Sequence, residues 1–221
     1  MVLNKYKAID YLYQYSKYHG NLMFDCESIN NDGHGFASLI LLFNILESVL
    51  KNAINDFDSN FFELITKAQD NNLINNYESD FLNNKQFGIR KIRNILSHAN
   101  LSKYNYILEN QDSALMYPFT ENSNCVILYE YLSPIIVNIM LKCVSNQITI
   151  NLEIDCTDEI INTPLKLVEL SPIELLKLKG FNDQEINQIV KGNSESINYL
   201  LAENASDINL IANIFKKISI Y

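Results

Sequence analysis

The strongest chemical signal in this chain is a short basic segment that ends in a histidine. Residues 90–98 read Arg-Lys-Ile-Arg-Asn-Ile-Leu-Ser-His and hold the only two arginines of the 221-residue sequence. An arginine binds a phosphate through paired planar donors, and a histidine exchanges protons near neutral pH. The combination of Arg90, Arg93 and His98 therefore suggests chemistry on a phosphodiester.

Charge is distributed unevenly around this segment. The formal net charge of the chain is −9, which argues against a protein that coats nucleic acid. Residues 81–108 nevertheless contain five basic residues and neither Asp nor Glu. Such an island on an acidic body favours a focused anion site over a broad binding face. An ordinary solvated helix face is the alternative that charge alone leaves open.

The residues that commonly bind metals are scattered along the chain. No two cysteines form a Cys-x-x-Cys pair, and the two remaining histidines have no ligand-like spacing. We expect free, buried thiols in a reducing cytoplasm, histidines in surface or loop positions, and neither a metal nor another cofactor. The residues concerned are Cys26, Cys125, Cys143, Cys156, His19 and His34.

No segment is expected to enter a membrane. The most apolar stretch, residues 36–50, is interrupted by Asn44 and Glu47 and falls short of the ~20 residues that a span requires. The first 20 residues mix charged and apolar side chains, unlike a secretory signal. The sequence therefore predicts a cytoplasmic protein.

Hydrophobic periodicity predicts an all-α main domain. Val2, Tyr6, Ile9 and Tyr13 follow helical steps, and residues 36–54 are apolar nearly all round, as in a central buried helix. Further helices are expected over residues 61–69, near 73–82 and over 86–98.

Two local signals define helix starts in this domain. Asp58 or Ser59 is expected to cap the helix at 61–69. Ser133-Pro134 is typical of an N-cap followed by a first-turn proline, which predicts a helix from there to about Val144. Residues 123–132 fit a helix or a strand.

Composition changes near Ser145, where we expect the main domain, residues 1–145, to end. Residues 148–155 alternate apolar and polar side chains, a strand-like period. Beyond them, residues 146–221 are expected to form a small, mostly α-helical domain. Helix caps are predicted at Ser171 with Glu174, at Gly180, and at Asn182 with Glu185, followed by helices near 195–202 and 207–218. A docking or dimerisation role is the interpretation that we favour for this domain.

The basic segment also fits a family pattern. Arg93-Asn94-Ile95-Leu96-Ser97-His98 is an Arg-x4-His element with a polar residue after the arginine, and it follows a long apolar helix that bears Glu47. This pattern resembles the HEPN superfamily (higher eukaryotes and prokaryotes nucleotide-binding), whose motif is Arg-x4–6-His. The resemblance covers roughly the first 145 residues and implies a HEPN-like helical bundle.

The resemblance implies a metal-independent endoribonuclease. RNA supplies its own nucleophile, the 2′-hydroxyl, so cleavage needs a base, an acid and a cation near the phosphate. The products would be a 2′,3′-cyclic phosphate and a 5′-hydroxyl. Proton transfer is assigned to His98 and phosphate binding to Arg93, and Asn94 lies one turn before His98, where it can orient the imidazole or the phosphate.

Other residues take supporting roles in this interpretation. Arg90, Lys91 and Ser97 are expected to contact the substrate. Glu47 is expected either to pair with an arginine or to be a plain helix-edge carboxylate. Position 100 is Asn, whereas one HEPN branch carries a modified tyrosine there, so no modification site is assigned.

Helix geometry adds a condition. At ~100° per residue, Arg93 and His98 lie ~140° apart and do not share a face. Either the arginine side chain wraps around the helix or two protomers complete the site, as HEPN dimers do. The implied partners are therefore RNA, a second copy of the chain, and an antitoxin or regulator, since HEPN domains are frequent in toxin–antitoxin and phage-defence (abortive infection) systems.

Two other functions remain open at this point. The chain could be a non-catalytic HEPN-like module that binds a nucleotide, RNA or a protein. It could also be a helical assembly protein in which Arg93 makes a surface ion pair and His98 interacts with the helix dipole.

Overall fold

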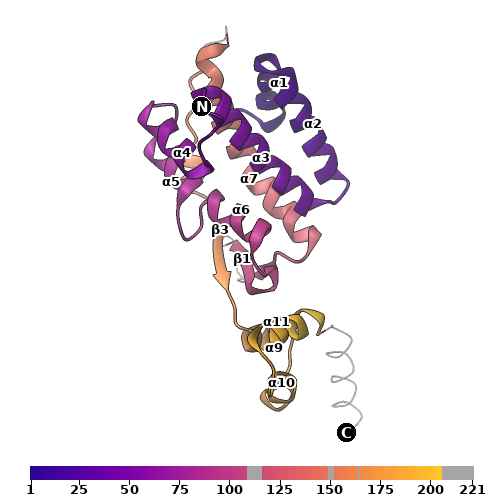
Figure 1. The fold of residues 1–221 in the computed structure, drawn as a ribbon. Coiled ribbons are helices and arrows are strands. Elements are labelled where there is room, and N and C mark those ends of the chain that lie inside the picture. Colours follow the sequence, from indigo (N-terminus) through magenta and orange to yellow (C-terminus); the bar gives the residue numbers. More distant parts are fainter. Residues whose placement is uncertain (109–115, 149–151, 164, 206–221) are drawn as a thin grey trace.

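The structure is a computed structural model, which describes residues 1–108, 116–148, 152–163 and 165–205. It is mostly helical, which confirms the expected helical character. Two long helices, α3 (Gly35–Ile54) and α7 (Asn122–Val144), pack together at the centre (Figure 1). α1 (Lys5–Tyr15) and α2 (Lys17–Asn31) cover one side, and α4 (Phe61–Asp70) and α5 (Asn76–Asn83) lie on the other.

The contact between α3 and α7 forms the middle of the core. By length and composition alone both helices would pass as membrane spans. In the fold, Leu42 and Phe43 of α3 and Ile136 and Met140 of α7 are fully buried. The helices approach closely at Gly35, where a Cβ would come 2.2 Å from the backbone nitrogen of Val126. Only a glycine permits this approach.

α6 (Ile89–His98) carries the basic segment and packs against α3 and α5. Its buried residues are Ile89, Ile92, Ile95 and Leu96, which form one apolar stripe. The stripe fixes how the helix is rotated, because these side chains must face the core. All the polar residues of the segment therefore lie on the remaining surface.

A small antiparallel sheet follows α6, which the sequence did not predict. A short 3-10 helix, η1 (Leu101–Lys103), leads into β1 (Tyr104–Leu108). β1 pairs with β2 (Met116–Pro118) on one edge and β3 (Leu165–Glu169) on the other. The register places Tyr106 opposite both Tyr117 and Leu167.

The C-terminal helices form a second, smaller core. These are α9 (Pro172–Leu178), α10 (Asp183–Val190) and α11 (Glu195–Asn204), and Leu176, Ile186 and Ala202 are buried among them. The predicted capping boxes at Ser171 and Asn182 are present, and Gly180 has the positive φ of a helix end, 83°. Residues 207–218 lie outside the described residues.

The region between the two cores belongs to the larger one. Ile154 and Cys156 are buried in the main core, α8 (Thr157–Ile161) contacts α5, and β3 joins the sheet. The separate core therefore begins near residue 171 rather than at 146. The expected strand is not formed by Ile148 or residues 152–155, and residues 149–151 lie outside the described part.

Two helix-start predictions were wrong. Pro134 lies inside α7, which begins twelve residues earlier at Asn122, so residues 123–132 are helical. The proline removes one backbone donor, but its apolar neighbours keep the helix in place by packing. The cap of α4 is Asn60, whose side chain accepts the Glu63 amide in a capping box, rather than Asp58 or Ser59.

One histidine prediction was also wrong. His19 lies in α2 with 4% of its surface exposed, and its Nε2 is 3.0 Å from Oγ of Ser48 on α3, which covers it. His34 is exposed, as predicted, and all four cysteines are free and buried, as predicted.

Candidate active site

The polar residues of α6 divide into two edges and a middle. Ile92 and Ile95 face the core, so helical spacing puts Arg93 at one edge of the polar surface and Lys91 at the other. Arg90 and Asn94 occupy the middle. Arg93 and Lys91 are half-buried, whereas Asn94 is exposed.

Arg93 is held by the central helix. Its Nη2 lies 2.5 Å from Oε2 of Glu47, and Nζ of Lys51 lies 3.0 Å from Oε1 of the same carboxylate. The guanidinium carbon is 5.1 Å from the centre of the Phe61 ring. Of the two roles that the sequence left open for Glu47, the structure has the pairing with an arginine.

Arg90 is also positioned, but without a carboxylate. Its Nε donates a hydrogen bond of 2.6 Å to Oδ1 of Asn83, and its guanidinium lies 5.2 Å from the Phe62 ring centre. No ion pair within the described residues neutralises this arginine. Arg90 therefore keeps its full charge available to an anion, whereas Glu47 engages one donor of Arg93, Nη2.

His98, Asn94 and Ser97 form an exposed polar row at the C-terminal end of α6. Asn94 and His98 are four residues apart, and so are neighbours on the helix surface. Within the described chain, no side chain bonds to the imidazole of His98. The row is thus open to solvent, while Arg93 faces α3, and the arginine and histidine do not share a face.

A cavity opens along the other edge of α6, beside β3. Its volume is about 380 Å³. The ammonium of Lys91 lies 5.4 Å from the centre of the Tyr104 ring, so a cation and an aromatic group meet at its wall. The lining residues are Lys85, Gln86, Lys91, Tyr104, Leu167, Val168 and Glu169.

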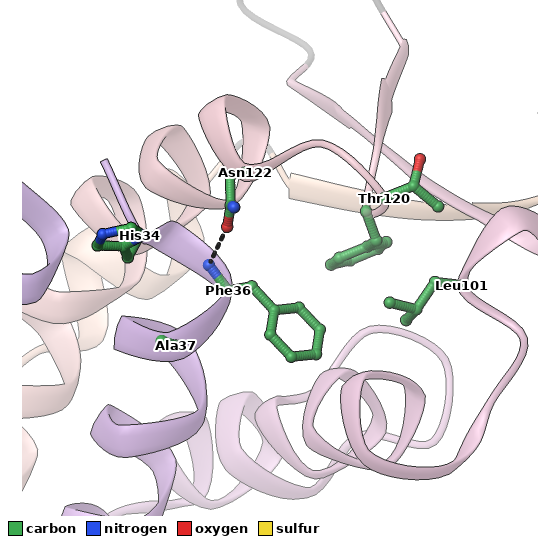
Figure 2. Close-up of a pocket in the computed structure, with 7 residues that line it drawn as sticks. His34, Phe36, Ala37, Leu101, Thr120 and Asn122 are labelled. Atoms are coloured by element: carbon green, nitrogen blue, oxygen red, sulfur yellow. Dashed lines mark hydrogen bonds between the residues drawn. The ribbon is translucent and has the colours of Figure 1, made fainter. Parts of the chain in front are cut away.

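A second cavity lies where α3 and α7 begin, and it does not involve the motif. Phe36 and Leu101 point into this space of about 290 Å³ (Figure 2), which Phe119 also lines. The Phe36 amide donates a 3.1 Å hydrogen bond to Oδ1 of Asn122. His34 is the one titratable side chain among its lining residues. None of the predicted site residues reaches this cavity.

Sequence reasoning missed the groups that position the basic side chains. The Phe61 ring lies against the guanidinium of Arg93, and the Phe62 ring lies against that of Arg90. Asn83 orients Arg90 through a hydrogen bond, and the Tyr104 ring lies near the ammonium of Lys91. The only signal in the sequence for these supporting groups is the pair of adjacent phenylalanines, Phe61 and Phe62. Two neighbouring helix residues cannot both face the core, and Phe62 is the exposed one. Among the described residues, no group of three His, Cys, Asp or Glu is placed to hold a metal ion.

Comparison with known proteins adds no relative. No family model, curated protein or solved structure matches this chain.

Proposed function

We propose that this chain is a metal-independent endoribonuclease of the HEPN type. The observation that carries the proposal is the Arg93–Glu47 ion pair beside the exposed Asn94, Ser97 and His98 row. A helix bearing Arg-x4-His next to a long helix with a carboxylate is the arrangement that the family resemblance implies. A phosphate-binding fork and a free imidazole on one short helix suit phosphodiester cleavage.

The proposed reaction uses the RNA 2′-hydroxyl as nucleophile. Its oxygen forms a bond to the adjacent phosphorus, and the bond from phosphorus to the 5′-oxygen breaks. His98 transfers protons, Arg93 binds the phosphoryl oxygens as negative charge develops, and Asn94 orients the imidazole. The 2′-hydroxyl proton goes to a base and the leaving 5′-oxygen receives a proton from an acid, which gives a 2′,3′-cyclic phosphate and a 5′-hydroxyl.

A homodimer is part of this proposal. One imidazole per chain does not supply a base and an acid at once, and Arg93 and His98 lie on different sides of α6. Two copies facing one cleft would supply both proton-transfer groups and bring an arginine of one protomer to the histidine of the other. The proposed biological role is a cytoplasmic toxin or phage-defence effector, with an antitoxin or regulator as a further partner.

The test is cleavage of a labelled single-stranded RNA by the full chain in EDTA. His98→Ala should lower the rate by at least about 100-fold, the lower range for general acid–base catalysis. His34→Ala is the matched control, because it removes another exposed histidine outside the motif. Circular dichroism and the urea midpoint check that both variants fold. Equal rates for wild type and His98→Ala contradict the proposal.

A binding module is the second candidate, and one observation favours it. Arg90 has no ion-pair partner among the described residues, so its charge can hold an RNA phosphate without any catalytic group. If the wild-type chain retains RNA without cutting it, and Arg93→Ala with His98→Ala weakens retention, the non-catalytic HEPN-like module is the better description.

A further inference from the structure

We propose that the cavity between α6 and β3 binds an RNA base next to the cleaved phosphate. This inference rests on the proposed function for its substrate, RNA. The cavity is separate from Arg93 and from the row of His98, Asn94 and Ser97, and it combines cations, an aromatic ring and a free strand edge. Each of these features matches a different part of a nucleotide.

The charge at the cavity suits a phosphate group. Lys85 is exposed and Lys91 is half-buried, and within the described residues neither forms an ion pair with a carboxylate. Glu169 also lines the cavity, but Nζ of Lys103, which Glu195 shares at 3.8 Å, lies 3.3 Å from its Oε1 and partly offsets its charge. Two free ammonium groups at the rim therefore attract the RNA backbone.

The aromatic ring suits a base. Tyr104 is half-buried in β1 and lines the cavity, with Lys91 5.4 Å from its ring centre. Bases stack on aromatic side chains with little dependence on sequence, and a neighbouring cation strengthens such contacts. The Tyr104 ring can therefore stack on a base of a single-stranded RNA while the Lys91 ammonium attracts its backbone.

The free strand edge offers hydrogen bonds to a base. The amide of Leu170 donates to the carbonyl of Lys103, and hydrogen-bonded positions alternate in an antiparallel pair. The backbone groups of Leu167 and Glu169 therefore point away from β1. Among the described strands none pairs with β3 on that side, and both residues line the cavity. These donors and acceptors, with the Gln86 amide, can contact the edge of a base.

The position of the cavity relates it to the proposed reaction. Lys91 and His98 are seven residues apart, so they lie within about 20° of each other and about 10 Å apart along α6. The strand that reaches His98 therefore passes the cavity on the same side of the helix. The base in the cavity belongs to a nucleotide beside the scissile phosphate, and it contributes to the choice of cleavage site.

Binding is measured in the His98→Ala background, where the RNA stays intact. Fluorescence anisotropy with 12-nucleotide single-stranded RNA gives the dissociation constant. Tyr104→Leu should raise this constant about tenfold, the loss expected for one stacked base, and Tyr104→Phe should keep it near the starting value. Lys91→Gln should weaken binding and flatten its salt dependence, whereas Lys191→Gln, on the smaller C-terminal core, is the matched control.

A second arm guards against a variant that misfolds. One base at a time is removed from the RNA by an abasic substitution, and the folded His98→Ala protein is titrated with each oligonucleotide. At one abasic position the affinity should fall about tenfold. Tyr104→Leu should lower the affinity for that oligonucleotide no further, because the same contact is already missing. Equal affinity for all abasic oligonucleotides overturns the inference. So does an absence of measurable RNA binding, or displacement by an extended peptide but not by RNA.

The two proposals fail in different ways. If wild type cleaves RNA while Tyr104→Leu has the same affinity and cleavage sites, the base site is refuted and the nuclease stands. If wild type does not cleave, yet the abasic and Tyr104→Leu losses coincide, the base site stands and the nuclease is refuted.

Discussion

Arg93 of α6 and Glu47 of α3 form an ion pair in which Nη2 and Oε2 are 2.5 Å apart. Both side chains are largely shielded from solvent, with 28% and 17% of their surfaces exposed. Lys51 contacts the second oxygen of Glu47, and the Phe61 ring lies against the guanidinium. The direction of Arg93 is thus set by its neighbours on α3 and α4 before any substrate arrives.

The first prediction concerns this preset direction. Glu47→Gln should lower the RNA cleavage rate roughly 10- to 100-fold. Without the carboxylate, the Arg93 guanidinium shifts and no longer holds the phosphate in line for the reaction. The free energy of unfolding should change by less than about 1 kcal/mol, since the pair is partly solvated. Rates come from the EDTA cleavage assay and stability from urea denaturation. Lys51→Gln removes the other partner of Glu47 and should retain most activity. Similar losses in both variants would contradict the explanation, because Lys51→Gln leaves the contact between Glu47 and Arg93 in place.

The sequence predicted the buried apolar stripe of α6 correctly, but not the residues of other helices that surround this helix. The apolar positions from Ile89 to Leu96 determine which residues of α6 are buried, and this follows from local spacing alone. The expected separation of Arg93 from His98 follows in the same way. Nothing local predicts that Phe61 and Asn83, from other helices, support the two arginines, because those contacts depend on how the helices pack.

The errors have the same origin. Pro134 has a local helix-start signal, but packing of α7 against α3 continues the helix through it. The sheet was missed because β1 and β3 are short and distant in sequence, and each becomes a strand by pairing with the other. His19 was placed on the surface because no local feature indicates that α3 covers it.

The second prediction concerns a buried ion pair that holds α5 to α7. Glu78 is fully buried, and its carboxylate oxygens lie 2.7 and 3.0 Å from Nζ of Lys142. Lys142→Met should lower the free energy of unfolding by about 3 kcal/mol, because it leaves a buried charge unpaired. The double variant Lys142→Met with Glu78→Gln should recover part of that loss. Urea denaturation measures both, and a double variant less stable than Lys142→Met would refute the explanation.

The third prediction concerns the thiols. Burial raises the pKa of Cys26, Cys143 and Cys156 to about 12 and that of Cys125 to about 11. Since the thiolate is the reactive form, native protein at pH 8 should resist iodoacetamide. Mass spectrometry should find four alkylated cysteines after unfolding in urea. Rapid labelling of any one of them in the native chain would show that its part of the core opens.

The final prediction concerns pH and the contact between α2 and α3. Nε2 of His19 lies 3.0 Å from Oγ of Ser48, while its buried Nδ1 has no partner among the described residues. Burial lowers the pKa of His19 below its usual 6.5, so the folded chain takes up this proton less readily than the unfolded chain. Its contribution is therefore fully present above about pH 6.5 and is lost as the pH falls from there through the lower pKa of the folded chain.

The free energy of unfolding is measured from urea curves for wild type and His19→Gln. The curves are taken between about pH 7.5 and about pH 5, the range in which linkage predicts the change. Wild type should lose more stability on acidification than His19→Gln, because the variant has no imidazole to protonate between α2 and α3. His34→Gln, which removes an exposed histidine, should follow the wild-type curve. Carboxylates titrate in all three proteins, so only the difference between curves reports on His19. Parallel curves for wild type and His19→Gln would mean that the imidazole reaches solvent when charged.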